Sequence, residues 1–209
     1  MELRFRLIVL TLVGLIAVAV WTFPAWRGFF RERSAQAAFP GLALDLQDDF
    51  LSLPPDTREA LLNMRASNAD MAMDMLLVAI RDPQAAPVDD RSAVNGARAL
   101  ASGEFQALDA LHWGVGEATI YELADATRIL RFEDFRSAPG GDVRVYLARD
   151  HQPLSALQLG DDFLDLGRLK GNVGDQSYFL PANHDLSVYN SAVVFCRQFN
   201  MSITVATLR

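Results

Sequence analysis

The sequence predicts a mostly β protein, with an antiparallel β-sandwich or small barrel at the C-terminus, preceded by a single transmembrane helix and a short helical pair. Short runs rich in β-branched and aromatic residues, separated by turn residues, fill the second half of the chain. A long uncharged apolar stretch near the N-terminus predicts the membrane helix. With 209 residues, of which 51% are hydrophobic, the chain is long enough to bury a substantial core.

Residues 7–23, which follow a charged tail at residues 1–6, contain no charged side chain. As a helix they span about 25 Å, enough to cross a membrane when Trp21 and Trp26 lie at its interface. A cleaved signal peptide is the alternative, because Ala35-Gln36-Ala37 has small residues at the two outer positions, as in a cleavage site. That site lies beyond several arginines and far from the apolar stretch, so we predict an uncleaved anchor.

A juxtamembrane linker at residues 24–55 leads to a predicted helical pair at residues 56–82. The first helix has a capping-box pattern at Asp56 and Glu59, and Asn68 is placed to cap the second helix. The second helix is apolar almost all round, so we expect it to be buried against the first helix, the β domain or another copy of the chain. Homo-oligomerisation through this methionine-rich helix is therefore one prediction.

The methionines of the second helix raise the alternative of a Cu(I) site, because thioethers are soft ligands. Met71 and Met75 share one face of the helix, whereas Met73 points away from them. We interpret the three methionines as adaptable packing residues, and keep Met71 and Met75 as copper ligands only as the alternative.

A connector at residues 83–100 precedes the β domain at residues 101–209. Asn200 marks a tight turn near the end of the domain. Six runs alternate or are rich in β-formers and are predicted to be strands, at residues 118–123, 128–132, 143–149, 176–180, 191–199 and 201–208.

The chain contains a single cysteine, Cys196, so it cannot form an internal disulfide. In the alternating run around it, Cys196 shares a face with Val194 and Gln198, and the opposite face carries larger apolar side chains. This pattern favours an accessible thiol, and a buried structural thiol is the alternative. The imidazole of His112 and the thiolate could together ligate haem iron or copper if the fold brings them close. The alternative for His112 is a histidine that a backbone group satisfies.

Several segments within residues 101–208 follow one another in a recognisable order: Leu111 to Gly116, Phe132 to Phe135, Pro139 to Leu147, Leu166 to Gly174, Tyr178 to Pro181 and Asp185 to Leu208. Together they resemble the DM-thirteen domain, an all-β module found beside DOMON domains. The family usually reads Gly-Pro-Asp where this chain has Gly140-Gly141-Asp142, a departure that we expect to loosen a turn without contacting the cysteine.

The resemblance implies a redox or electron-transfer role centred on Cys196, either as a bare thiol or as a ligand to haem or copper, with no prosthetic group as an equal alternative. His112 matches a histidine that the family keeps near its first strand. The resemblance and the short N-terminal tail also imply a periplasmic or extracellular C-terminal part, although a strict count of flanking basic residues favours the cytoplasm. The competing interpretation is a non-enzymatic extracytoplasmic binding or adhesion module with a structural cysteine.

Several classes of function are disfavoured by the sequence. It lacks the serine-hydrolase, zinc-protease and phosphate-loop motifs, which makes an electron-transfer or binding module a better interpretation than a turnover enzyme. Covalent c-type haem needs two cysteines. The net charge of −7 argues against nucleic acid as a binding partner. The partners that we expect are the membrane and an unidentified redox or protein partner. We predict solvated turns for the remaining histidines and for an acidic cluster, at His151, His184, Asp161, Asp162 and Asp165.

Overall fold

A computed structural model of the chain describes residues 38–89, 94–182 and 184–209. The chain divides into two compact units, residues 1–52 and residues 53–209. The predicted N-terminal tail and anchor, residues 1–6 and 7–23, lie outside the described residues, as does the first part of the predicted linker. Within the described ranges no helix combines the length and the apolar character needed to span a membrane.

The described part of the first unit contains a 3₁₀ turn, η1 (Leu44–Leu46), and a short helix, α2 (Gln47–Ser52). The Gln47 side chain accepts a hydrogen bond from the backbone N–H of Phe39 at 3.2 Å and donates one to the carbonyl of Leu42 at 3.0 Å. Phe39 and Phe50 pack edge to face, with ring centroids 5.5 Å apart. One glutamine and one aromatic pair thus fix the local conformation of this segment.

Two antiparallel helices open the second unit, α3 (Pro55–Ser67) and α4 (Ala69–Ala79). Asn68 caps α4 as predicted, because its Oδ1 accepts the backbone N–H of Met71 at 3.0 Å. The capping box predicted at Asp56 and Glu59 is wrong. Helix α3 already begins at Pro55, which suits the first helical position because that position needs no N–H donor, and its cap makes no side-chain hydrogen bond.

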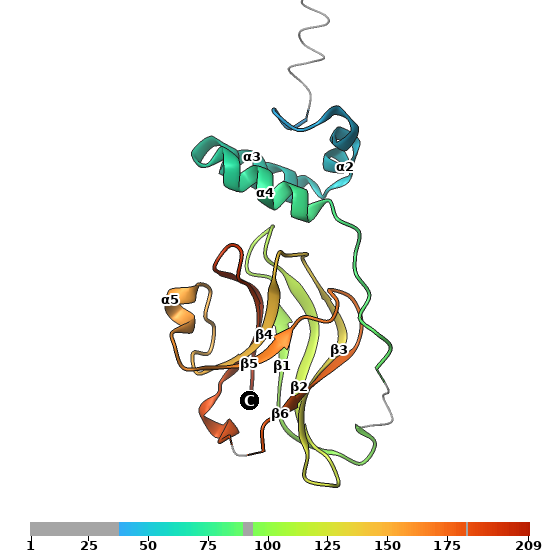
Figure 1. Ribbon diagram of the computed structural model, residues 1–209, viewed down its shortest axis with the longest axis vertical. Coiled ribbons are helices and arrows are strands. Elements are labelled where there is room, and N and C mark those ends of the chain that lie inside the picture. Colours follow the sequence, from blue (N-terminus) through green and yellow to red (C-terminus); the bar gives the residue numbers. More distant parts are fainter. Residues whose placement is uncertain (1–37, 90–93, 183) are drawn as a thin grey trace, which may run out of the picture. The chain divides into compact units, whose positions relative to one another are not determined.

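The β domain is one antiparallel sheet, in the order β5-β4-β7-β8-β1-β2-β3-β6. Its edge strands β5 and β6 approach each other, so the sheet is nearly closed and barrel-like (Figure 1). Two short helical segments, α5 (Ala156–Leu159) and η3 (Leu186–Val188), lie in its connections. The strands are β1 (Arg98–Gln106), β2 (Gly114–Glu122), β3 (Arg128–Ser137), β4 (Val143–Ala148), β5 (Phe163–Arg168), β6 (Gln176–Leu180), β7 (Ser191–Cys196) and β8 (Met201–Thr207).

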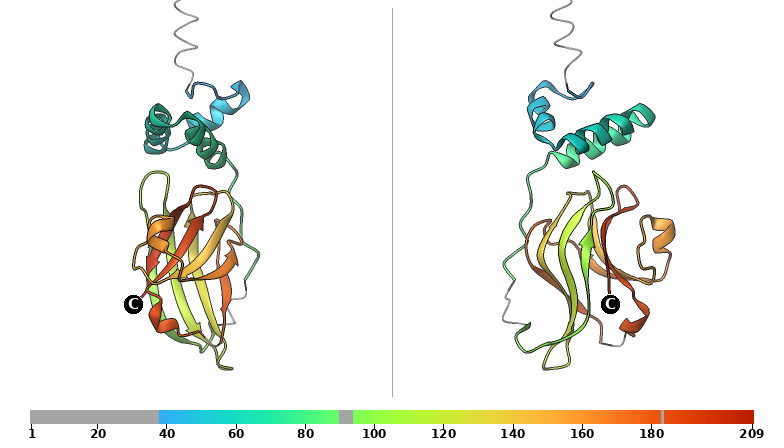
Figure 2. Two further views of the ribbon diagram at one scale, coloured as in Figure 1. Left: turned by 60° about the vertical axis from the view of Figure 1, so that its left-hand side comes forward. Right: turned by 180° about the vertical axis from the view of Figure 1, so that it is seen from behind.

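The order of the strands places the last one in the middle of the sheet. Strand β8 pairs with β7 along its length and with β1 at Phe105 and Gln106. Beyond this ladder, Ser102 and Arg209 exchange two backbone hydrogen bonds of 3.0 and 2.9 Å. The second view of Figure 2 shows the C-terminal strand running beside the first strands of the domain.

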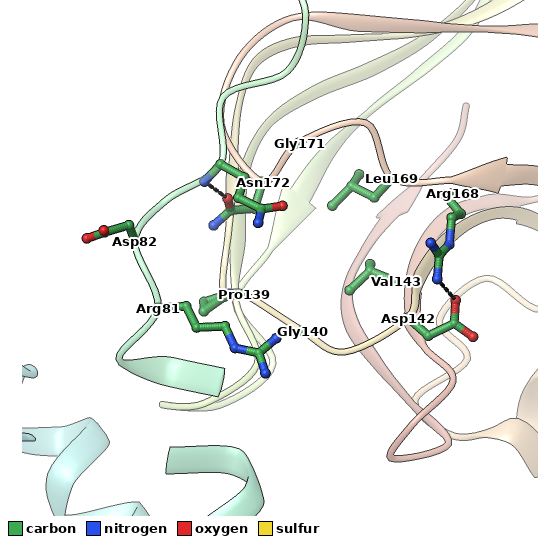
Figure 3. A pocket seen from close by; sticks show the side chains of 11 residues that line it. Arg81, Asp82, Pro139, Gly140, Asp142, Val143, Arg168, Leu169, Gly171 and Asn172 are labelled. Carbon is green, nitrogen blue, oxygen red and sulfur yellow. Dashed lines mark hydrogen bonds and ion pairs between the residues drawn. The ribbon is translucent and has the colours of Figure 1, made fainter. Parts of the chain in front are cut away.

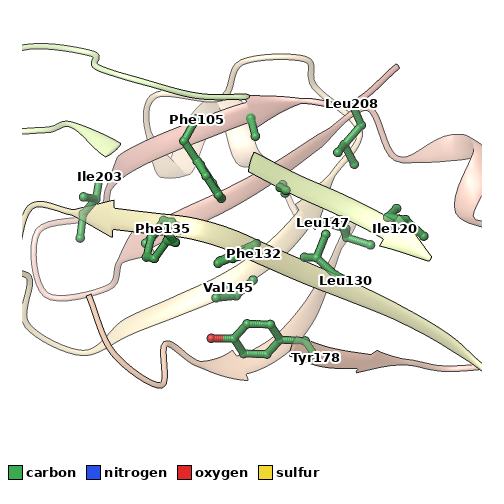
Figure 4. Packing of buried hydrophobic residues seen from close by; sticks show 14 of the residues in the cluster. Phe105, Ile120, Leu130, Phe132, Phe135, Val145, Leu147, Tyr178, Ile203 and Leu208 are labelled. Carbon is green, nitrogen blue, oxygen red and sulfur yellow. The ribbon is translucent and has the colours of Figure 1, made fainter. Parts of the chain in front are cut away.

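Aromatic rings fill the interior of the sheet (Figure 4). Phe132 lies at the centre, with its ring centroid 4.8 Å from that of Phe105, 5.0 Å from that of Phe135 and 5.6 Å from that of Tyr178. Aliphatic residues from β2, β4, β7 and β8 complete the cluster, and all its core members are almost fully buried. Because such side chains supply most of the hydrophobic free energy of folding, this cluster is the core that holds the strands together.

Strand β7 is buried on both faces. Val194 and Cys196 point into the interior cluster, whereas Val193 and Phe195 belong to a second cluster on the other side of the sheet, which includes Leu159 of α5. The chain turns after Cys196, so the predicted strand at residues 191–199 is three residues too long. Asn200 has the positive φ of 55° that a tight turn requires, as predicted.

Candidate functional site

A cavity of about 120 Å³ contains both principal candidates, Cys196 and His112. Cys196 is the last residue of β7, and His112 lies in the loop that leads into β2. The rest of the lining comes from the helical pair and the residues just before it, from loops of the β domain and from β8, and is mainly apolar: Leu53, Pro54, Thr57, Met75, Val78, Ala79, Ala110, Leu111, Trp113, Ala138, Pro139, Gly140, Phe199 and Ile203. Two residues 84 positions apart therefore face one small apolar space.

The thiol of Cys196 is buried, with 2% of the residue exposed. The preference for an accessible thiol is therefore wrong. The alternation of side chains around Cys196 favours a strand with one face toward solvent, but β7 lies between β4 and β8 and packs on both faces. Cys196 lines the cavity, and its thiol donates a hydrogen bond to the carbonyl of Gly141 at 3.1 Å.

The turn at Gly140 and Gly141 is part of the site, contrary to the expectation that it does not contact the cysteine. Besides the bond from the thiol to the Gly141 carbonyl, Gly140 approaches the site so closely that a Cβ there would lie 2.6 Å from Cδ1 of Ile203 and 3.6 Å from Sγ of Cys196. A Cβ at Gly141 would collide with the side chain of Gln198. The pair of glycines therefore lets the turn pack directly against the thiol.

His112 is held by a carboxylate. Its Nδ1 lies 2.9 and 2.8 Å from the two carboxylate oxygens of Asp109, and its backbone N–H donates to Oδ1 at 2.7 Å. Burial acts to raise the pKa of Asp109, but hydrogen bonds from the His112 ring and from the N–H of Leu111 outweigh it, so this pKa lies below its usual value. The ionised carboxylate fixes the ring with a proton on Nδ1.

That arrangement leaves Nε2 of His112 with a free lone pair in the neutral ring. The residue is only 6% exposed and lines the cavity, and among the described residues no group forms a hydrogen bond with Nε2. Asp109 was not predicted from the sequence, although its spacing of three residues from His112 is a recognisable signal for a carboxylate–imidazole pair.

The helical pair contributes Met75 to the same cavity. Met75 is 8% exposed and lines the cavity, whereas Met71 is 38% exposed and does not line it. A hydrogen bond of 3.1 Å from Oγ1 of Thr57 to the carbonyl of Ala110 ties α3 to the loop that carries His112. Of the two methionines predicted as alternative copper ligands, the structure brings only Met75 to the cysteine and the histidine.

The cavity limits which prosthetic group it can hold. Pockets for drug-sized ligands begin at roughly 300 Å³, and haem is at least as large as such ligands, so haem does not fit in about 120 Å³. Within the described ranges no group of three histidine, cysteine, aspartate or glutamate side chains gathers as a metal site. His151, His184, Asp161, Asp162 and Asp165 are exposed and lie away from the cavity. The turn predicted at Asp165 is wrong, because this residue lies within β5 and pairs with Arg144 of the neighbouring strand at 2.9 Å.

A second, polar cavity of about 210 Å³ shares Pro139 and Gly140 with the first (Figure 3). Arg168 pairs with Asp142 there at 3.1 Å, and Asn172 Oδ1 accepts the backbone N–H of Gln84 at 2.6 Å. The second bond joins the connector to the loop between β5 and β6, whereas the first lies within the β domain.

Comparison with known proteins gives one match. A family model described as electron transfer DM13 matches residues 104–208, which is half of the chain and includes Cys196 and His112. No curated protein and no solved structure matches this chain.

Proposed function

The chain belongs to the electron transfer DM13 family, and from this premise we propose that its β domain has a redox role centred on the thiol of Cys196. The observation that carries the proposal is the cavity, which a buried thiol and a buried imidazole both line. Burial protects a thiol from reaction with bulk oxidants, and electrostatic interactions are stronger in the low dielectric of an apolar site. The site thus suits electron exchange better than turnover of a large substrate.

The experiment that tests this role is mediated voltammetry of the purified full chain and of Cys196→Ser. We expect a reversible redox response in the wild type that Cys196→Ser abolishes. Serine can still donate a hydrogen bond to the Gly141 carbonyl, so the fold should persist. Val194→Ala is the matched control, because it removes core volume from the same face of β7 and leaves the thiol in place.

Two results would count against the redox role. One is a wild type without a redox response, and the other is a response that survives in Cys196→Ser. Either would favour the competing interpretation, a binding or adhesion module in which Cys196 is a core residue.

We also propose that residues 7–23 anchor the protein in a membrane, with the β domain outside the cytoplasm. Support comes from the uncharged stretch of 17 residues and the short tail before it. We expect the full chain to resist alkaline extraction from membranes, and alkaline phosphatase fused after Arg209 to be active. Leu15→Arg should weaken insertion, because a charge at the membrane centre costs about 2.5–3.5 kcal/mol. An inactive fusion would place the β domain in the cytoplasm instead.

A further inference from the structure

Three soft donors line the cavity, and they come from three separate parts of the chain. Sγ of Cys196 comes from the end of β7, the imidazole of His112 from the loop before β2, and the thioether of Met75 from α4. All three residues are less than one-tenth exposed. Thiolate, thioether and imidazole are the ligands that proteins use for copper.

The histidine is already arranged as a metal ligand. Imidazoles that bind metals almost always donate their other ring N–H to a carboxylate or a carbonyl, which fixes the tautomer. Asp109 provides that acceptor for Nδ1 of His112, at 2.8 Å from Oδ2. Nε2 has no partner among the described residues, although the ring is buried and lines the cavity. Nε2 is therefore the ring atom that is open to the cavity and available to a bound ion.

The composition of the lining selects among metals. No aspartate or glutamate is part of it, and apolar side chains such as Val78, Phe199 and Ile203 make up much of the rest. Hard ions such as Mg²⁺ and Ca²⁺ require several oxygen ligands, and structural Zn²⁺ needs four ligands of the histidine, cysteine and carboxylate types. A set of two sulfur atoms and one nitrogen, shielded from water, instead suits Cu(I).

We propose that this cavity binds one Cu(I) ion through Sγ of Cys196, Nε2 of His112 and the thioether of Met75. The inference rests on the proposed redox function, for which it names the group. On binding, the S–H bond of Cys196 breaks, its proton leaves to solvent, and a bond from sulfur to copper forms, so that the hydrogen bond to the Gly141 carbonyl is lost. Asp109 acts as a positioning residue that keeps Nε2 available.

The proposal is tested by anaerobic titration of the purified full chain with Cu(I), in competition with a chromophoric Cu(I) chelator. We expect one equivalent to bind. Cys196→Ser and His112→Gln should abolish competition, and Met75→Leu should weaken affinity by about tenfold or more, because a soft donor is replaced by a non-donor of similar volume. Met71→Leu is the matched control on the same helix, and its affinity should equal that of the wild type.

Two further measurements separate ligands from structural residues. X-ray absorption at the copper edge should show two sulfur scatterers in the wild type and one in Met75→Leu. Asp109→Asn should lower affinity by about 10- to 100-fold while keeping both sulfur scatterers, as expected when a partner of a ligand is lost.

The copper assignment is overturned if the wild type does not compete with the chelator, or if Met75→Leu binds as tightly as the wild type. These outcomes are separable from failure of the proposed function. A voltammetric response that depends on Cys196 without Cu(I) binding would leave the redox role standing on the bare thiol, whereas loss of both would overturn the two proposals together.

Discussion

Replacing Arg131 with methionine is expected to lower the free energy of unfolding by roughly 3–5 kcal/mol, the cost of removing one partner from a buried ion pair. Arg131 is fully buried on β3, on the face of the strand opposite the aromatic core. Its guanidinium lies 3.2 Å from Glu133, 3.4 Å from Asp89 and 3.5 Å from Asp175, as measured between the nearest nitrogen and oxygen atoms.

The size of the effect follows from the charges left behind. The three carboxylates are each no more than 28% exposed, and one buried guanidinium is their shared counter-ion. Without it they repel one another in a poorly solvated site, and the hydroxyl of Ser177 loses the N–H that donates to it at 3.0 Å. Because Asp89 belongs to the connector, the loss should also loosen the connector from the sheet.

Chemical denaturation of the full chain measures this difference. Arg149→Met is the matched control, since Arg149 pairs with Asp162 at 2.6 Å but both side chains are more than half exposed. Such surface pairs contribute about 0–1 kcal/mol. An Arg131→Met variant whose stability lies within the range of this control would show that the buried network contributes no net stability.

The second large effect is expected at Gly116, where alanine should lower stability by roughly 2–6 kcal/mol. Gly116 forms a bulge between β2 and β3 and has a φ of +103°. A Cβ there would lie 2.6 Å from the carbonyl oxygen of Glu133 and 2.8 Å from that of Asp134. The strained backbone costs about 1–3 kcal/mol, and the clash with rigid backbone adds a cost of similar size.

A substitution at Gly167 allows the cost of the backbone strain to be measured without the cost of the clash. It also lies at a register shift, between β4 and β5, and has a φ of +105°, but a Cβ there would meet nothing within 4 Å. Gly167→Ala should therefore lower the free energy of unfolding only by the cost of the strained backbone, about 1–3 kcal/mol. If Gly116→Ala and Gly167→Ala have the same unfolding midpoint in urea, the clash with the backbone of β3 does not contribute to the loss of stability. Gly116 belongs to one of the segments that carry the family resemblance, and this bulge gives the physical reason for a glycine at that position.

Strands could be predicted from the sequence where a local run of β-forming residues marks them. The bounds of β6 coincide with the predicted run at residues 176–180, and β4 ends one residue before its predicted end. Strand β1 was missed because its nine residues include alanines, a serine and Gly103, which have little β-propensity. A glycine is required at position 103 by tertiary packing, because a Cβ there would collide with the backbone of Thr207 in β8.

The candidate site was predictable only in part, because it is assembled by long-range contacts. Cys196 and His112 could be chosen from residue type and from the resemblance, but their meeting in one cavity depends on how the loop before β2 is placed against the end of β7. The thiol's burial depends on elements that pack over both faces of β7, and alternation within one strand carries no such information. Met75 enters the site from a helix outside the matched part of the chain.

The place of β8 in the sheet determines when the domain can be completed during protein synthesis. Cys196 pairs with Met201 of β8, and β8 is the strand that joins β7 to β1. The sheet can therefore close only after residues 201–209 have been made. Ile203 of β8 lines the cavity together with Cys196, so the pocket around the thiol is complete only once β8 has paired with β7 and β1.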